Sequence, residues 1–215
     1  MRIYLDLDCL EKLAACGLLD DILKRLGASH EDVFIVKSFK YSWKSKANAY
    51  KKAGKKELAE SYERVASIME SFSLVSLDTE GLRLADALNG IEKIDAGEQT
   101  LAAAAATCPE KCLLLTSDSN FVSAIVQAYQ KQGKVLRPFK KMKILHLYQI
   151  LEWLCSKIPY DELYKKMTTK QATDCDIVIA RSFFIGADIK KTKESLTEAI
   201  NGFPHDFCIK IETLP

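Results

Sequence analysis

The chain has 215 residues, 48% hydrophobic and 28% charged, with a formal net charge of +2. This composition excludes a disordered or fibrous protein and allows one substantial hydrophobic core. The chain opens in a strand-like segment without a signal-peptide pattern, and no apolar stretch reaches the roughly 18 residues of a membrane-spanning helix. We therefore expect a cytoplasmic protein without a membrane partner. Its seven cysteines, an odd number, are expected to be reduced core thiols.

The first third of the chain predicts one strand followed by helices. Residues 2–8 alternate apolar and polar side chains, as in a half-buried strand. Residues 9–26 repeat apolar side chains at helical spacing, with a break near Gly17. Residues 33–36 fit either a short strand or a helix start, and the lysine-rich stretch that follows, as far as Met69, consists mostly of helix-forming residues.

The middle of the chain alternates helices and strands. Residues 73–77 and 82–91 fit no single pattern, but the following elements are expected: a helix over 96–107, a strand over 111–116, a helix over 120–132 and a short strand over 135–138. This order is typical of an α/β fold, a three-layer sandwich with a mainly parallel central sheet. Such sheets bind ligands at the carboxyl ends of their strands.

The pattern changes after residue 150, so we divide the chain into a domain over 1–150 and an extension over 151–215. The extension is expected to contain a helix over 150–166, a polar linker-like stretch, a strand over 175–185, a helix over 191–200 and a strand over 207–211. These elements form either a small β-α-β-like appendage or additional strands of the main sheet.

Five acidic residues fall where this fold places ligand sites. Asp6 and Asp8 are expected on one face of the first strand, Asp95 and Glu98 start the alanine-rich helix, and Asp118 follows the strand KCLLL. Carboxylates that converge at strand ends repel one another, and a Mg²⁺ or Mn²⁺ ion relieves that repulsion. A metal held in this way suits phosphodiester hydrolysis.

Each acid also has a structural explanation. Asp95 and Glu98 match a capping box, and Asp118 matches a helix N-cap. The pair Asp6 and Asp8 is harder to explain by structure alone. Two carboxylates on an otherwise apolar strand cost several kcal/mol unless they reach solvent, hydrogen bonds or a metal.

A basic stretch with interleaved aromatic side chains follows the first helical segment. Lysine beside exposed aromatics suits phosphate contact combined with base stacking, as in single-stranded nucleic-acid binding. The alternative is a solvated helix face whose aromatics point into the core. The candidate nucleic-acid-binding residues are Lys37, Lys40, Tyr41, Trp43, Lys44, Lys46, Lys51 and Lys52.

Three segments resemble PIN-like domains. IYLDLDCLEKLAACGLLDDI resembles their first strand and helix, DAGEQTLAAAAA resembles the alanine-rich helix of one subgroup, and LLLTSDSNF resembles the strand that supplies their last acid. The resemblance covers residues 1 to about 140. It departs from the family where IVKSFKYSWKSK offers lysines and serines in place of a usual acidic residue.

The resemblance implies a Mg²⁺- or Mn²⁺-dependent endoribonuclease, often a toxin paired with an antitoxin, or an RNA-processing factor. It implies RNA as partner, with an antitoxin, another protein or a second copy of the chain as further partners. Asp6, Glu98 and Asp118 are then the catalytic and metal-binding acids, and Asp8 or Asp95 assists them. Nearby supporting residues are Thr116, Ser117 and Asn120.

Two other functions fit parts of the sequence. A phosphatase of the HAD type would use Asp6 as nucleophile, Asp8 two residues on, and Thr116 as a phosphate-binding hydroxyl. Its later pair of acids has no counterpart after a strand. A catalytically degenerate PIN-like module would bind RNA or protein through the same basic stretch, because a fold does not guarantee a chemistry.

Overall fold

The computed structural model describes residues 1–169, 179, 182–183 and 188–201. At its centre is a five-stranded sheet in the order β3-β2-β1-β4-β5, with every pairing parallel. The predicted α/β class with a parallel sheet is therefore confirmed. The strands are β1 (Arg2–Leu5), β2 (Val33–Ile35), β3 (Ser73–Leu74), β4 (Cys112–Thr116) and β5 (Ile144–His146).

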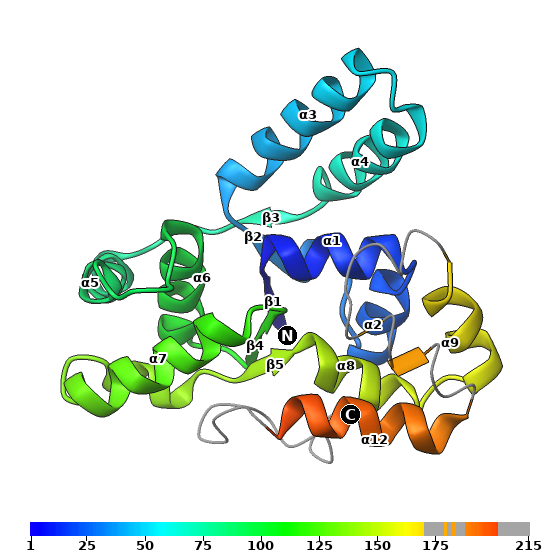
Figure 1. Ribbon diagram of the computed structural model, residues 1–215. Helices are drawn as coiled ribbons and strands as arrows, with labels where there is room; N and C mark the ends of the chain where they lie inside the picture. Colours follow the sequence, from blue (N-terminus) through cyan, green and yellow to red (C-terminus); the bar gives the residue numbers. More distant parts are fainter. Residues whose placement is uncertain (170–178, 180–181, 184–187, 202–215) are drawn as a thin grey trace.

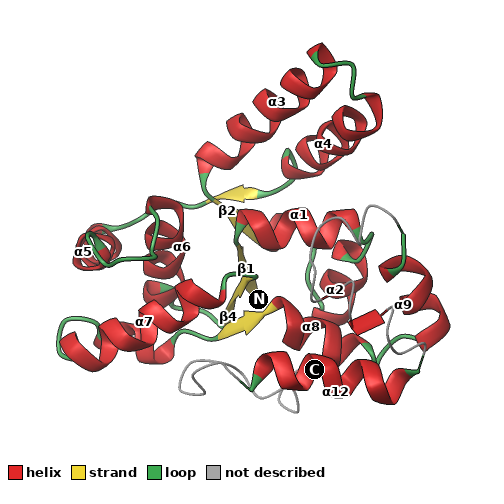
Figure 2. Cartoon of the chain, viewed as in Figure 1, coloured by secondary structure: helices red, strands yellow, loops and turns green. Residues whose placement is uncertain are grey.

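Helices cover both faces of the sheet (Figures 1 and 2). One face of the sheet is covered by the α-helices that connect β3 to β4 and β4 to β5. They are α5 (Thr79–Leu88), α6 (Ala96–Thr107) and α7 (Ser119–Gln132). Those on the opposite side are α1 (Leu7–Ala15), α2 (Leu19–Leu26), α8 (Leu147–Leu154), α9 (Tyr160–Met167) and α12 (Ile189–Ile200). Short 3₁₀ turns occupy η1 (His30–Asp32) and η2 (Arg137–Lys141). In the described part of the chain, no helix combines the length and apolar character needed to cross a membrane.

The central strands are apolar on both faces because helices cover both. All five residues of β4 are buried, as are Ile3, Tyr4 and Leu5 of β1. Such continuous apolar runs are typical of parallel sheets. One hydrophobic cluster extends from Ile3 through α8 to Leu196 of α12, which packs against α8.

The first strand is shorter than the sequence predicts. It ends at Leu5, and the carboxylate of Asp6 accepts a hydrogen bond from the backbone N–H of Leu7 at the start of α1. Asp8 lies in the first turn of that helix. The prediction that Asp6 and Asp8 share a strand face is therefore wrong, because helix capping by the aspartate ends the strand.

Two later strand predictions are also corrected. Residues 135–138 form no strand, because Pro138 lies in the first turn of η2, and the strand follows instead at Ile144–His146. In the predicted strand over 175–185, the residues described (Ile179, Ser182 and Phe183) are helical. The predicted strand over 207–211 lies outside the described residues, as does most of the polar stretch after 169.

Several predicted helices are confirmed with small changes in their bounds. Gly17, with φ of 61°, separates α1 from α2, and α6 spans residues 96–107 as expected. The helix predicted over 150–166 is divided into α8 and α9, with Pro159 as the N-cap of α9. The five cysteines in the described residues are free thiols, and all but Cys108 are buried.

The basic stretch forms α3 (Lys37–Lys52), which pairs with α4 (Lys56–Met69) in a hairpin that projects from the body of the molecule (Figure 1). Trp43 is only 1% exposed and packs on Tyr62 at 4.5 Å between ring centroids. The prediction that Trp43 contacts nucleic acid is therefore wrong. Helical spacing places Phe39, Trp43 and Ala47 on one buried stripe.

Replacing Trp43 with alanine should lower the free energy of unfolding by about 3 kcal/mol or more, because a large buried ring leaves a cavity. Tyr41→Ala is the matched control on the same helix, since Tyr41 is 65% exposed. It should change stability by less than about 0.5 kcal/mol. Urea denaturation followed by circular dichroism measures both, and equal losses in the two variants would contradict the burial of Trp43.

Candidate functional site

The topology of the sheet brings the ends of β1 and β4 together. The two strands are parallel neighbours, with Leu5 opposite Leu115, and the backbone N–H of Asp6 donates to the carbonyl of Leu115 at 3.0 Å. From β1 the chain leads to β2 on one side, while β4 lies on the other side, so the strand order reverses between β1 and β4. Ligand sites of open parallel sheets lie at this reversal, beyond the carboxyl ends of the strands.

A pocket of about 430 Å³ lies at this point. All five acids singled out from the sequence line it. The lining residues are Asp6, Leu7, Asp8, Phe39, Lys93, Ile94, Asp95, Glu98 and Asp118. The acids thus meet in space, although they come from three separate segments of the chain.

Asp6 is the most buried aspartate of the pocket, with 8% of its surface exposed. Its Oδ1 accepts the N–H of Leu7 at 2.7 Å, and its Oδ2 accepts the hydroxyl of Thr116 at 3.3 Å. Thr116 also accepts the backbone N–H of Asp118 on the same hydroxyl oxygen, at 3.1 Å. The predicted supporting role of Thr116 therefore has a structural counterpart, because this residue joins two of the acids.

Asp95 and Glu98 form the expected capping box at the start of α6. Asp95 Oδ1 accepts the N–H of Glu98 at 2.8 Å, and Glu98 Oε2 accepts the N–H of Asp95 at 2.9 Å. The structural explanation of these acids is thus correct, and both still line the pocket. Each keeps one carboxylate oxygen that accepts no hydrogen bond from the described residues.

Asp118 likewise both caps a helix and lines the pocket. It is the N-cap of α7, where its Oδ1 accepts the N–H groups of Asn120 and Phe121 at 2.6 and 3.1 Å. Its Oδ2 accepts no hydrogen bond from the described part of the chain. Capping therefore holds the Asp118 side chain through Oδ1 and leaves Oδ2 available to a ligand in the pocket.

The electrostatics of the pocket disfavour ionised carboxylates. The pKa of Asp6 is raised from 3.8 to about 7, mainly by burial and in smaller part by the charge of Asp8. Burial also raises the pKa of Glu98 from 4.5 to about 8, with contributions from Asp95, Asp6 and Asp118. The acids therefore interact with one another, as the sequence argument expects.

Within the described residues, none of the five acids forms an ion pair with a lysine, arginine or histidine. Lys93 lines the pocket and has a φ of 70°. A left-handed conformation is unfavourable for a residue with a side chain and is often found at functional sites. Among the described residues that line the pocket Lys93 is the only cation, and it forms no ion pair with the acids.

An all-oxygen set of carboxylates matches the ligand preference of Mg²⁺ and Mn²⁺. The side chains are not arranged around a common point, since the described residues contain no group of three or more His, Cys, Asp or Glu able to hold one metal ion. The donor chemistry therefore fits a hard divalent cation, and binding one requires the free oxygens to turn inward.

The remaining predicted residues differ in their relation to the pocket. Ser117 Oγ is buried without a hydrogen-bond partner in the described structure, and the side chain of Asn120 belongs to a neighbouring groove rather than to the carboxylate pocket. Phe39 and Lys93 line the pocket but were not predicted. Gly97 signals the proximity of Phe39, because a Cβ on Gly97 would lie 3.2 Å from that ring.

The lysines of α3 are partly neutralised. Lys40 and Lys44 pair with Glu70 at 3.9 and 2.6 Å, and Lys51 pairs with Glu63 at 3.4 Å. Lys46 lies 5.7 Å from the centre of the Trp43 ring. The candidates that are exposed and form no ion pair within the described residues are Lys37, Tyr41, Lys46 and Lys52.

The fold and the pocket define a class: an α/β protein with an all-parallel sheet and a carboxylate-lined site at the strand-order reversal. Comparison with protein-family models, with curated proteins and with solved structures finds no match to this chain.

The raised pKa of Asp6 predicts a specific dependence of stability on pH. Between about pH 4 and pH 7 the native state binds more protons here than the unfolded state, so the free energy of unfolding falls as pH rises. Asp6→Asn keeps the N-cap and stays neutral. It should therefore be more stable than the parent above pH 7, by up to about 4 kcal/mol at 1.36 kcal/mol per pH unit, and should gain nothing below pH 4.

Denaturation in chelator at pH 4 and pH 8.5 measures this difference. Asp86→Asn is the matched control, because Asp86 is exposed on α5 and does not line the pocket. A stability difference between Asp6→Asn and the parent that is the same at both pH values would contradict the assignment.

Proposed function

We propose that this protein is a Mg²⁺- or Mn²⁺-dependent ribonuclease of PIN-like type that hydrolyses RNA phosphodiesters. One observation supports the proposal above the others. Five carboxylates from three segments line one pocket at the strand-order reversal, and no basic side chain of the described structure pairs with them. Clustered carboxylates with raised pKa values are a common feature of functional sites, and a set of carboxylate oxygens suits a hard divalent cation.

Asp6, Glu98 and Asp118 would hold the metal, with Asp8 or Asp95 completing the set. When bound, Mg²⁺ or Mn²⁺ lowers the pKa of a coordinated water and neutralises charge on the leaving oxygen. Thr116 holds Asp6 in place through its hydroxyl, and the first backbone N–H groups of α7 hold Asp118. These hydrogen bonds keep Asp6 and Asp118 at the pocket, and the side chains would still have to move closer together to hold a cation.

Phe39 and Lys93 shape the pocket from the other side. Phe39 occupies the segment where the resembled family carries a further acid, so the pocket has an aromatic wall there. Lys93 supplies the positive charge that a phosphate needs in order to approach acidic residues. Lys37 and Tyr41 are exposed on the same helix as Phe39, on the other side of that helix, and would contact RNA outside the pocket.

Glu98→Gln and Asp118→Asn should each reduce Mn²⁺-dependent RNA cleavage by about 100-fold or more, since each removes a charged ligand and keeps the helix cap. Asp86→Asn should cleave like the parent. The assay follows a fluorescent RNA oligomer on a gel, in Mn²⁺ and in chelator. Cleavage by both site variants at the parent's rate would contradict the proposal.

A second candidate is a PIN-like module that binds RNA or protein without turnover. The absence of an assembled metal-binding group within the described residues favours it, together with Phe39 in place of an acid. In the same assay this candidate predicts that the parent shifts the RNA on a native gel in chelator and leaves it intact in Mn²⁺.

A further inference from the structure

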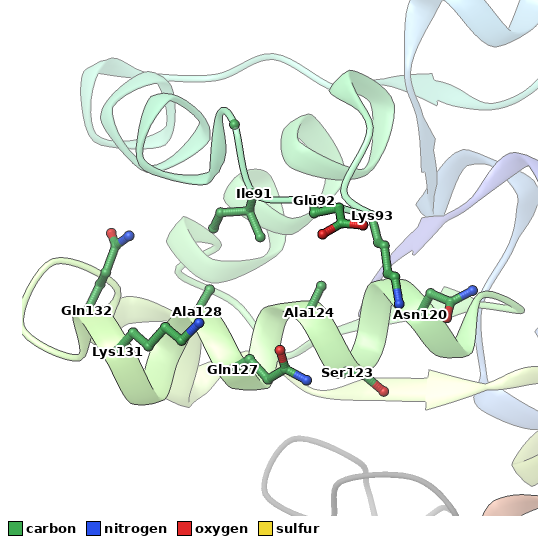
Figure 3. A pocket seen from close by; sticks show the side chains of 11 residues that line it. Ile91, Glu92, Lys93, Asn120, Ser123, Ala124, Gln127, Ala128, Lys131 and Gln132 are labelled. Atoms are coloured by element: carbon green, nitrogen blue, oxygen red, sulfur yellow. The ribbon is translucent and has the colours of Figure 1, made fainter.

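A second pocket, of about 390 Å³, lies next to the carboxylate site (Figure 3). One wall is the loop of residues 90–93 between α5 and α6, and the other wall is a face of α7. Lys93 lines both pockets, so the groove begins where the carboxylate site ends. A ligand that spans both would pass this lysine.

The α7 wall consists of one helical stripe. Its members recur at spacings of three and four residues, which places them on a single face. They are Asn120, Ser123, Ala124, Gln127, Ala128, Lys131 and Gln132. The short side chains of Ala124 and Ala128 point toward the loop of residues 90–93, and longer polar side chains lie beside them, as Figure 3 shows. From Asn120 to Lys131 the face extends about 16 Å at 1.5 Å per residue.

The charges of this groove favour an anionic ligand. Lys93 and Lys131 lie along it, at the end nearest the acids and toward the far end respectively, and neither forms an ion pair within the described residues (Figure 3). Glu92 is the one acid among the lining residues. The amides of Asn120 and Gln127 and the hydroxyl of Ser123 can each donate and accept hydrogen bonds. Two separated lysines with hydrogen-bonding side chains between them suit the sugar-phosphate backbone of a nucleic acid.

We propose that this groove binds the RNA strand next to the bond cleaved in the carboxylate pocket, with Lys93 and Lys131 contacting successive parts of its phosphate backbone. This inference rests on the proposed function for the placement of the scissile bond. The face of about 16 Å is about as long as five nucleotides of a helical strand at about 3.4 Å each. The polar side chains between the lysines face the sugars and base edges.

The test measures RNA binding apart from cleavage. Fluorescence anisotropy of a labelled oligouridylate about eight nucleotides long is followed in chelator, over a series of salt concentrations, for the parent, Lys131→Gln and Lys93→Gln. Lys131→Gln should weaken binding about 5-fold and reduce the slope of log affinity against log salt by about 0.7, as expected for one lost phosphate contact to a single strand. Lys93→Gln should behave similarly.

Lys111→Gln is the matched control, because Lys111 is an exposed lysine at the opposite edge of the sheet, just before β4. It should bind like the parent. Unchanged affinity and salt slope in both groove variants, or a parent that does not bind the oligomer, would overturn the inference. Binding that depends on Lys131 without cleavage in Mn²⁺ would overturn the proposed function and leave the groove assignment standing.

Discussion

The parallel pairing of β1 with β4 is the constraint on which the site depends. It places Asp6 directly beside the end of β4, where Thr116 and the cap of α7 hold Asp118. The crossover from β3 through α5 and α6 then brings Glu98 and Asp95 to the same edge. Because the two strands run in the same direction, one edge of the sheet collects the acids that separate segments supply.

The burial of two of these acids lowers the stability of the fold near neutral pH. The buried Asp6 and Glu98 have raised pKa values, so near neutral pH their ionisation costs part of the free energy of folding. Helix capping offsets some of this cost, since Asp6 accepts the N–H of Leu7 in α1 and Glu98 accepts the N–H of Asp95, the N-cap residue of α6. A divalent cation would offset more of this cost, because it would neutralise carboxylates that form no ion pair within the described residues.

Much of this fold could be predicted from the sequence because its strands and helices have clear periodicities. The alanine-rich helix and the strand KCLLL follow directly from pattern, and all five acids meet as expected. Local patterns failed where one residue serves two purposes: Asp6 continues an alternating pattern but caps a helix, and Trp43 lies among lysines but packs on Tyr62. Phe39 and Lys93 were missed because their positions depend on tertiary packing.

We propose that these carboxylates form a site for a divalent cation. Calorimetric titration of Mn²⁺ into chelator-treated protein near pH 7.5 tests it, with Asp6→Asn and Asp86→Asn in parallel. We expect binding by the parent and by Asp86→Asn, with proton release as the acids with raised pKa values ionise, and at least about tenfold weaker binding by Asp6→Asn. Absence of Mn²⁺ binding by the parent, or equal binding by Asp6→Asn, would contradict it.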